Sequence, residues 1–68
     1  MQMQIGKVYH QEFQNGERLY VRIIERFANG RFKGLETYGR CKPVQRSVDP
    51  TIPFWIETAE NDIPKKLR

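Results

Sequence analysis

The sequence predicts a small all-β domain: an antiparallel meander of about five strands, curled into an SH3-like or OB-like barrel. The first observation is a repeat, because Phe-x-Asn-Gly occurs at 13–16 and again at 27–30. Asn-Gly between two strand-like runs is the strongest short-range signal for a β-hairpin. The second is that five glycines, spread between residues 6 and 39, interrupt any run of helical period.

The two Asn-Gly sites divide the first part of the chain into strands near residues 6–13, 18–27 and 31–38. The central segment is rich in Leu, Tyr, Val and Ile, and it alternates over residues 18–23. We expect each turn to be a two-residue type I′ loop, with positive φ at Gly16 and Gly30. The repeat therefore predicts two successive hairpins that share one central strand.

The signal is weaker after Gly39. Pro43 limits residues 40–48 to an edge strand or a loop, since proline has no N–H for the ladder. Residues 54–57 form a short apolar run and a plausible fifth strand. At most one helical turn is expected, near residues 58–62, with Thr58 as its N-cap.

Length and composition predict one domain, residues 1–64, followed by a basic tail, residues 65–68, that we expect to fray. A chain of 68 residues buries only about 60% of its unfolded surface, so its core is small. The charged fraction of 29% has mixed signs, which indicates a folded chain. Several short strands in a chain of this size tend to close into a barrel.

Several classes of protein and site are disfavoured. No apolar run approaches the ~20 residues that span a bilayer, and the N-terminus is too short and polar for a signal peptide. We therefore expect a cytoplasmic protein. Cys41 is the only cysteine and His10 the only histidine, so no internal disulfide, metal site, cofactor or catalytic residue is predicted.

The net charge of +4 is unevenly distributed along the chain. Residues 18–46 carry eight basic side chains against two acidic ones, whereas residues 47–64 carry four acidic side chains and no basic one. The tail adds three more basic residues. The basic charge therefore coincides with the segment that has the strongest strand signal.

Two-residue loops would place one apolar set on a single face of the sheet, because side chains alternate with period two. Its members would be Val8, Leu19, Val21, Ile23, Phe27, Phe32 and Tyr38. The opposite face would interleave aromatic and basic residues. Its candidate members are Tyr9, Phe13, Arg18, Tyr20, Arg22, Arg26 and Lys33. Bases stack on aromatic rings while cations follow the phosphates, so this pattern is typical of a surface for single-stranded nucleic acid.

We therefore expect a binding module rather than an enzyme, with single-stranded RNA or DNA favoured over duplex because no helix is available for the major groove. The alternative is a protein-interaction module, or a homo-oligomeric assembly or regulatory module without a nucleic-acid ligand, using open strand edges and Trp55. An enzyme is the second alternative. The position of the acidic segment 49–62 decides between the first two, because it neutralises the basic face if it packs across it.

Overall fold

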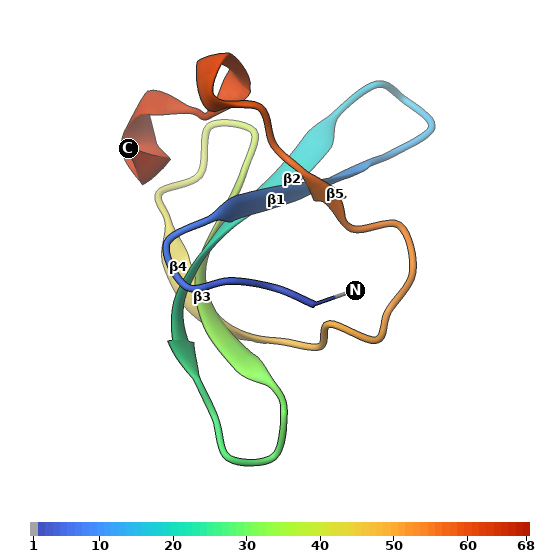
Figure 1. The fold of residues 1–68 in the computed structure, drawn as a ribbon. Helices are drawn as coiled ribbons and strands as arrows, with labels where there is room; N and C mark the ends of the chain where they lie inside the picture. The colour runs from blue at the N-terminus through green and yellow to red at the C-terminus, as the bar shows by residue number, and fades with distance from the viewer. Residues whose placement is uncertain (1) are drawn as a thin grey trace.

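The protein is described by a computed structural model covering residues 2–68. Its elements are the strands β1 (Val8–Glu12), β2 (Arg18–Arg26), β3 (Phe32–Tyr38), β4 (Val44–Val48) and β5 (Ile56–Glu57), followed by the 3-10 turns η1 (Glu60–Asp62) and η2 (Lys65–Leu67). The strands form one antiparallel sheet in the order β4-β3-β2-β1-β5 (Figure 1). The all-β class and the five-stranded meander are confirmed. The sheet is bent but keeps β4 and β5 as its two edges, so it is not closed into a barrel.

Both hairpins turn through three-residue loops. The N–H of Phe13 donates to the carbonyl of Glu17 at 2.9 Å, and the N–H of Phe27 donates to that of Arg31 at 2.8 Å. Gly16 and Gly30 close the loops at φ +84° and +86°. The predicted positive φ at both glycines is confirmed. The predicted two-residue loops are wrong, because neither asparagine has positive φ and each loop contains one more residue.

The longer loop moves the register of β1 by one residue. Tyr9 pairs with Val21 and His10 pairs with Tyr20, whereas a two-residue loop would set Tyr9 opposite Arg22. A slip of one residue transfers every side chain of a strand to the other face. Tyr9 therefore lies on the apolar face, and the prediction that it shares a face with Arg18 and Tyr20 is wrong.

We call the apolar side of the sheet the core face. Its buried members are Tyr9, Val21, Ile23, Phe32 and Val48, with Met3 and the partly buried Trp55 packed against them. The N-terminal segment and the loop that follows β4 supply these two covering residues. The buried positions of Val21, Ile23 and Phe32 confirm this part of the predicted apolar face. Val8 was predicted to share it, but it pairs with Arg22 and so lies on the opposite face.

The opposite side, which we call the tail face, is covered by residues 58–68. The N–H of Thr58 donates to the carbonyl of Val8 at 2.8 Å, and Leu67 is only 2% exposed. The tail that was expected to fray therefore forms η2 and docks. Thr58 is not an N-cap: its hydroxyl bonds to His10 instead, and Ala59 precedes η1 without a side-chain cap.

A bulge interrupts the pairing of β2 with β3. Ile23 pairs with Gly34, but the next pair is Glu25 with Lys33, so Ile24 is the extra residue. The bulge changes the parity of β2, and Arg26 pairs with Phe32 on the core side. Arg26 and Arg22 therefore lie on opposite faces, contrary to the prediction. Among residues 2–68, no helix has the length and apolar character needed to cross a bilayer.

Replacing Gly30 by valine should lower the free energy of unfolding by about 1–2 kcal/mol or more. A β-branched residue resists the left-handed conformation that the turn requires. Gly30→Asn is the matched control, since asparagine adopts this conformation more readily, and it should lose clearly less. Urea unfolding of the three proteins measures the difference. Equal stability of the valine and asparagine variants would contradict this account of the loop.

Replacing Gly34 by alanine should destabilise the sheet by about 1–3 kcal/mol through overpacking. A Cβ there would lie 2.3 Å from Val21 Cγ2 and 3.1 Å from Val48 Cγ2, and both valines are buried. Val21→Ala removes the nearest methyl group. The double variant should therefore lose less stability than the sum of the two single changes. Additive losses in a double-mutant cycle would show that the contact is not the cause.

Candidate nucleic-acid interface

The seven predicted binding residues do not form one surface. Tyr9 is 2% exposed, and its hydroxyl accepts a hydrogen bond from the N–H of Gln4 at 2.9 Å. Phe13 is exposed, but its ring meets that of Tyr38 edge to face at 5.6 Å, near the end of the core face. Neither ring lies beside Arg18 and Tyr20, because the register moved by one residue.

Three of the predicted cations do not lie on a shared binding face. Arg26 lies on the core side beyond the bulge, and Lys33 forms an ion pair with Glu25 at 3.5 Å. Arg22 is held under the tail, where its guanidinium donates to the backbone carbonyls of Leu67 and Gly6. The side chain of Arg22 therefore links β2 to the C-terminal segment through hydrogen bonds. The acidic segment 49–62 does not supply these partners.

Arg18 and Tyr20 are the two predicted residues that the fold brings together at a concave surface. They line a groove of about 320 Å³, with Thr37 of β3 and with Pro64 and Lys66 of the C-terminal segment. We call this the end groove. Arg18 pairs with Glu12 at 2.6 Å, and its Nη1 donates to the Tyr20 hydroxyl at 3.4 Å. Glu17 also lines the groove and accepts a hydrogen bond from the hydroxyl of Tyr38.

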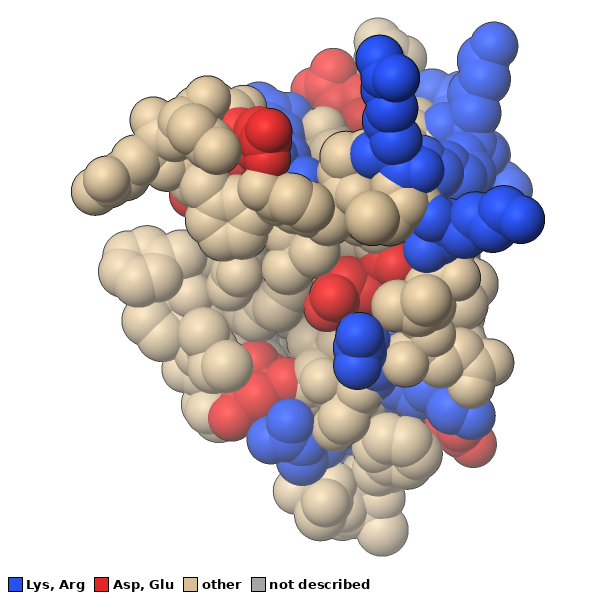
Figure 2. All heavy atoms as spheres, turned by 180° about the vertical axis from the view of Figure 1, so that it is seen from behind, with Lys and Arg blue, Asp and Glu red and all other residues tan. Residues whose placement is uncertain are grey.

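Beside the end groove lies a cluster of cations that sequence reasoning did not place. The ammonium of Lys66 donates to the carbonyls of Gly39 and Cys41, each at 2.8 Å, and so ties the tail to the turn after β3. We call the cations of these two segments the basic end. Its members are Arg40, Lys42, Lys65, Lys66 and Arg68. Figure 2 shows lysine and arginine side chains gathered at its upper right, which is the end where the C-terminal segment lies in Figure 1.

The carboxylates that form ion pairs are bound to other cations, so the cations of the basic end have no carboxylate partner among the described residues. The ion pairs join Arg18 to Glu12, Arg31 to Asp49, Lys33 to Glu25 and Arg46 to Glu36. Within residues 2–68, no carboxylate side chain pairs with a cation of the basic end. Arg68 instead donates to the carbonyls of Ile63 and Glu60. The sequence shows the basic charge of residues 18–46 and that of the tail as separate features. Because the tail was expected to fray, the two were not predicted to lie together.

No family model, curated protein or solved structure matches this chain. The candidate site therefore rests on its geometry and charge alone. Among the described residues, no group of three or more His, Cys, Asp or Glu side chains is arranged to hold a metal ion. Cys41 is exposed, beside the cations of the basic end.

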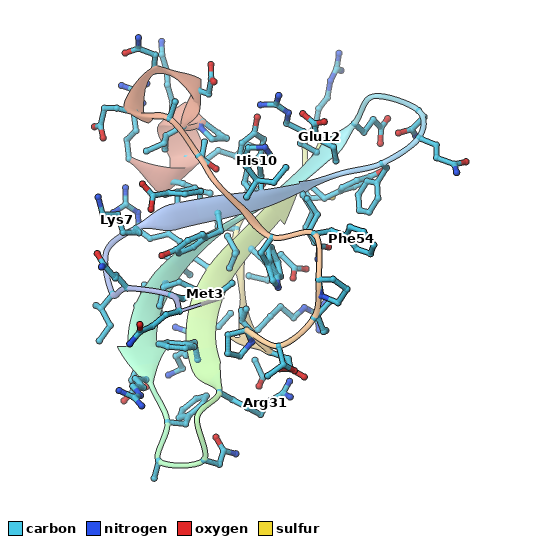
Figure 3. All side chains as sticks on the ribbon, turned by 45° about the vertical axis from the view of Figure 1, so that its right-hand side comes forward. Met3, Lys7, His10, Glu12, Arg31 and Phe54 are labelled. Atoms are coloured by element: carbon cyan, nitrogen blue, oxygen red, sulfur yellow. The ribbon has the colours of Figure 1, made fainter. Side chains whose placement is uncertain are left out.

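His10 connects the sheet to the segment that carries the basic end. It is buried, its Nδ1 is hydrogen-bonded to Thr58 Oγ1 at 2.7 Å, and its ring lies 5.6 Å from that of Tyr20. Figure 3 shows His10 on the side of β1 that faces the C-terminal segment. Burial lowers its pKa below the ordinary 6.5, and the nearby Arg18 lowers the pKa further, against smaller opposing effects of Glu12 and Asp62.

Stability should fall as the pH is lowered from about 7 to about 5. The folded state holds His10 neutral because its pKa is lowered, while the unfolded state binds a proton at the ordinary pKa. The contribution of His10 to stability is therefore fully present above its pKa in the unfolded state, and it is lost as the pH falls through its pKa in the folded state. Urea unfolding across this range measures the slope. His10→Gln should flatten it, and an unchanged slope would assign the effect to other groups.

Proposed function

We propose that this domain binds single-stranded nucleic acid at the basic end, with the end groove receiving an unpaired base. The observation that carries the proposal is the group of cations, without a carboxylate partner in the described chain, that two distant chain segments bring together: Arg40, Lys42, Lys65, Lys66 and Arg68. The proposed ligand is the class expected from the sequence, single-stranded nucleic acid. The proposed binding surface differs, because it lies at the basic end and not on the middle of the sheet.

The charge of the basic end suits a phosphate backbone. Cations already paired with carboxylates gain little from a phosphate, because the competing acid must first be displaced or repelled. The cations of the basic end have no such competitor, so their full charge is available to release condensed counterions from the ligand. Arg18 is expected to contribute less, since Glu12 lies 2.6 Å away.

The shape of the end groove favours a single strand over a duplex. Tyr20 is half-buried in a groove of about 320 Å³, next to Thr37 and Pro64. A base inside a duplex is stacked on both sides and does not reach a recessed ring, whereas an unpaired base does. One strand can then place its phosphates at the basic end and one of its bases against Tyr20 at the same time.

The alternative is an assembly module without a nucleic-acid ligand. It is favoured by a different surface, around the exposed Phe54. Phe54 lies outside the basic end, so the two functions are tested with different measurements.

Binding to short random-sequence DNA and RNA strands should weaken as salt rises. Arg40→Ala and Lys42→Ala should each weaken binding to all sequences and reduce the salt slope by about one unit at most. Fluorescence anisotropy at two salt concentrations measures both effects. Arg46→Ala is the matched control, since Arg46 is an exposed cation near Glu36 and outside the cluster. Absence of binding at low salt, or an equal loss in the control, would refute the proposed surface.

Tyr20→Ala should weaken single-strand binding by roughly 1–3 kcal/mol while leaving the salt slope nearly unchanged, because stacking releases no counterion. Tyr20→Phe keeps the ring and should bind almost normally. Thermal unfolding of both variants checks the fold, since Tyr20 also contacts His10. A phenylalanine variant that binds as weakly as the alanine variant would remove the stacking role.

A further inference from the structure

Phe54 is the most exposed large apolar residue of the described chain. Its side chain is 79% exposed, and its backbone has φ +80°, the only positive value at a non-glycine residue among residues 2–68. A bulky residue in this conformation is an outlier that the surrounding structure has to impose. Figure 3 shows its ring projecting away from the body of the protein.

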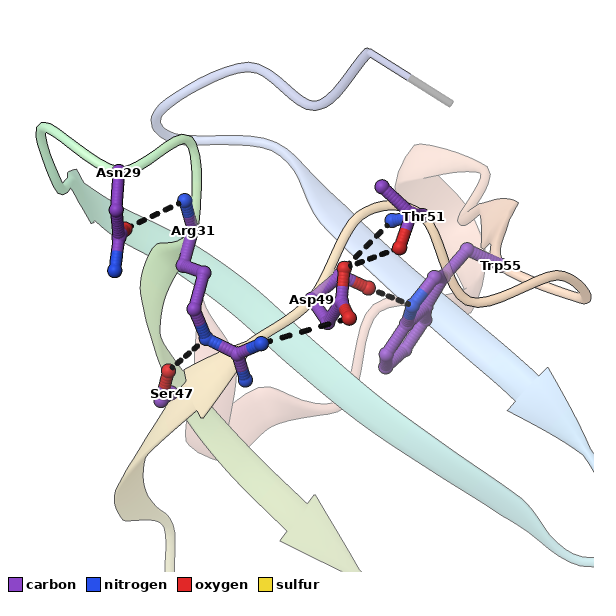
Figure 4. Close-up of polar contacts among 6 residues, drawn as sticks. All are labelled: Asn29, Arg31, Ser47, Asp49, Thr51 and Trp55. Atoms are coloured by element: carbon purple, nitrogen blue, oxygen red, sulfur yellow. Dashed lines mark hydrogen bonds and ion pairs between the residues drawn. The ribbon is translucent and has the colours of Figure 1, made fainter.

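The loop that carries Phe54 is held by polar contacts (Figure 4). Arg31 donates to Ser47 Oγ at 2.9 Å and pairs with Asp49 at 3.5 Å. Asp49 Oδ1 accepts hydrogen bonds from the N–H and the hydroxyl of Thr51, at 2.9 and 2.6 Å, and these bonds lower the pKa of its carboxyl group. The loop is therefore fixed on the side of Asp49.

Trp55 fixes the other side. Its indole Nε1 donates to the carbonyl of Asp49 at 3.2 Å, and its ring packs against the hydrophobic core. The neighbouring Phe54 is left outside. Because the flanking residues are already ordered, a partner that covers Phe54 orders little additional backbone, and this lowers the entropic cost of binding.

The charge around Phe54 restricts the partner. The exposed Glu57 of β5 lies three positions beyond Phe54, and no basic residue occurs between residues 47 and 64. The other acidic residues of this range lie elsewhere, since Asp49 pairs with Arg31 and Glu60 and Asp62 belong to η1. A phosphate backbone would be repelled here, although a base could stack on the ring. A symmetric contact between two copies would set one Glu57 against the other. The complementary partner is an apolar recess with a basic rim.

The end groove of the same protein has this character. Tyr20 and Pro64 supply apolar surface, and Lys66 lies on its wall, next to Lys65 and the other cations of the basic end. Glu17 also lines the groove, but its carboxylate is hydrogen-bonded by the Tyr38 hydroxyl. We propose that Phe54 of one copy inserts into the end groove of a second copy. The contact is head to tail, so it uses different surfaces on the two copies and extends into a ring or an open chain. The contact does not require nucleic acid, but Phe54 and the proposed base would exclude each other from the same groove.

The contact should be weak and reversible. An interface built around one side chain and its rim belongs to the small class, below roughly 1,200 Å² of total buried area. Sedimentation of the protein alone, without nucleic acid, should show a mass that rises with concentration and falls with added salt. A monomer at every concentration would overturn the proposal.

Phe54→Ala should weaken self-association by about tenfold or more, as expected for a central anchor. Ile5→Ala is the matched control, because Ile5 is also apolar and is 62% exposed. It should associate like the unmodified protein. Equal association of Phe54→Ala and the unmodified protein would exclude Phe54 as the anchor.

A mixing experiment tests the head-to-tail geometry. Phe54→Ala retains a normal groove, and Lys66→Glu retains a normal anchor. Neither variant should self-associate alone, whereas a mixture of the two should form a dimer. Lys65→Glu serves as a second groove variant, because Lys66 also holds Gly39 and Cys41. Thermal unfolding checks that all variants fold. If the mixtures remain monomeric, or the groove variants associate normally alone, the groove is not the acceptor.

Discussion

The register of β2 against its two neighbours is the constraint on which the rest of this structure depends. Gly16 and Gly30 set that register, because each ends a three-residue loop in a conformation that other residues adopt at a cost. Since the side-chain period of a strand is two, the loop length decides which residues enter the core. Tyr9 is buried and His10 faces the tail because the loop between β1 and β2 contains three residues and not two.

The same constraint explains what the sequence could and could not predict. The Asn-Gly repeat and the run between its two copies were sufficient for the hairpins, the central strand and the buried Val21 and Ile23. Asn-Gly occurs in loops of either length, so the repeat did not determine whether Tyr9 or His10 would face the core. The bulge at Ile24 has no local signal of its own. Gly34, which leaves room for Val21, is consistent with an irregularity nearby, because a glycine within a strand often marks a bulge.

The candidate site was harder to predict than the fold because it is assembled from distant segments. Arg18 and Tyr20 were selected from strand alternation, and they do share a groove. The cations beside them come from the turn after β3 and from the tail, and backbone carbonyls hold them together through Lys66. Bonds from a side chain to a carbonyl leave no residue pattern. The four ion pairs likewise became visible only in the fold, so the available positive charge could not be located from composition.

The docked C-terminal segment also determines the order in which the molecule assembles. The hairpin loops span three residues each, whereas the contacts of the tail join residues 48 positions apart at His10 and Thr58, and 45 apart at Arg22 and Leu67. Closing a long loop costs more chain entropy, so we expect the hairpins to form first and the tail to dock last. Release of residues 58–68 would then dismantle the basic end while the sheet stays folded. Any ligand of the basic end is therefore thermodynamically linked to tail docking, and it stabilises the docked state by mass action.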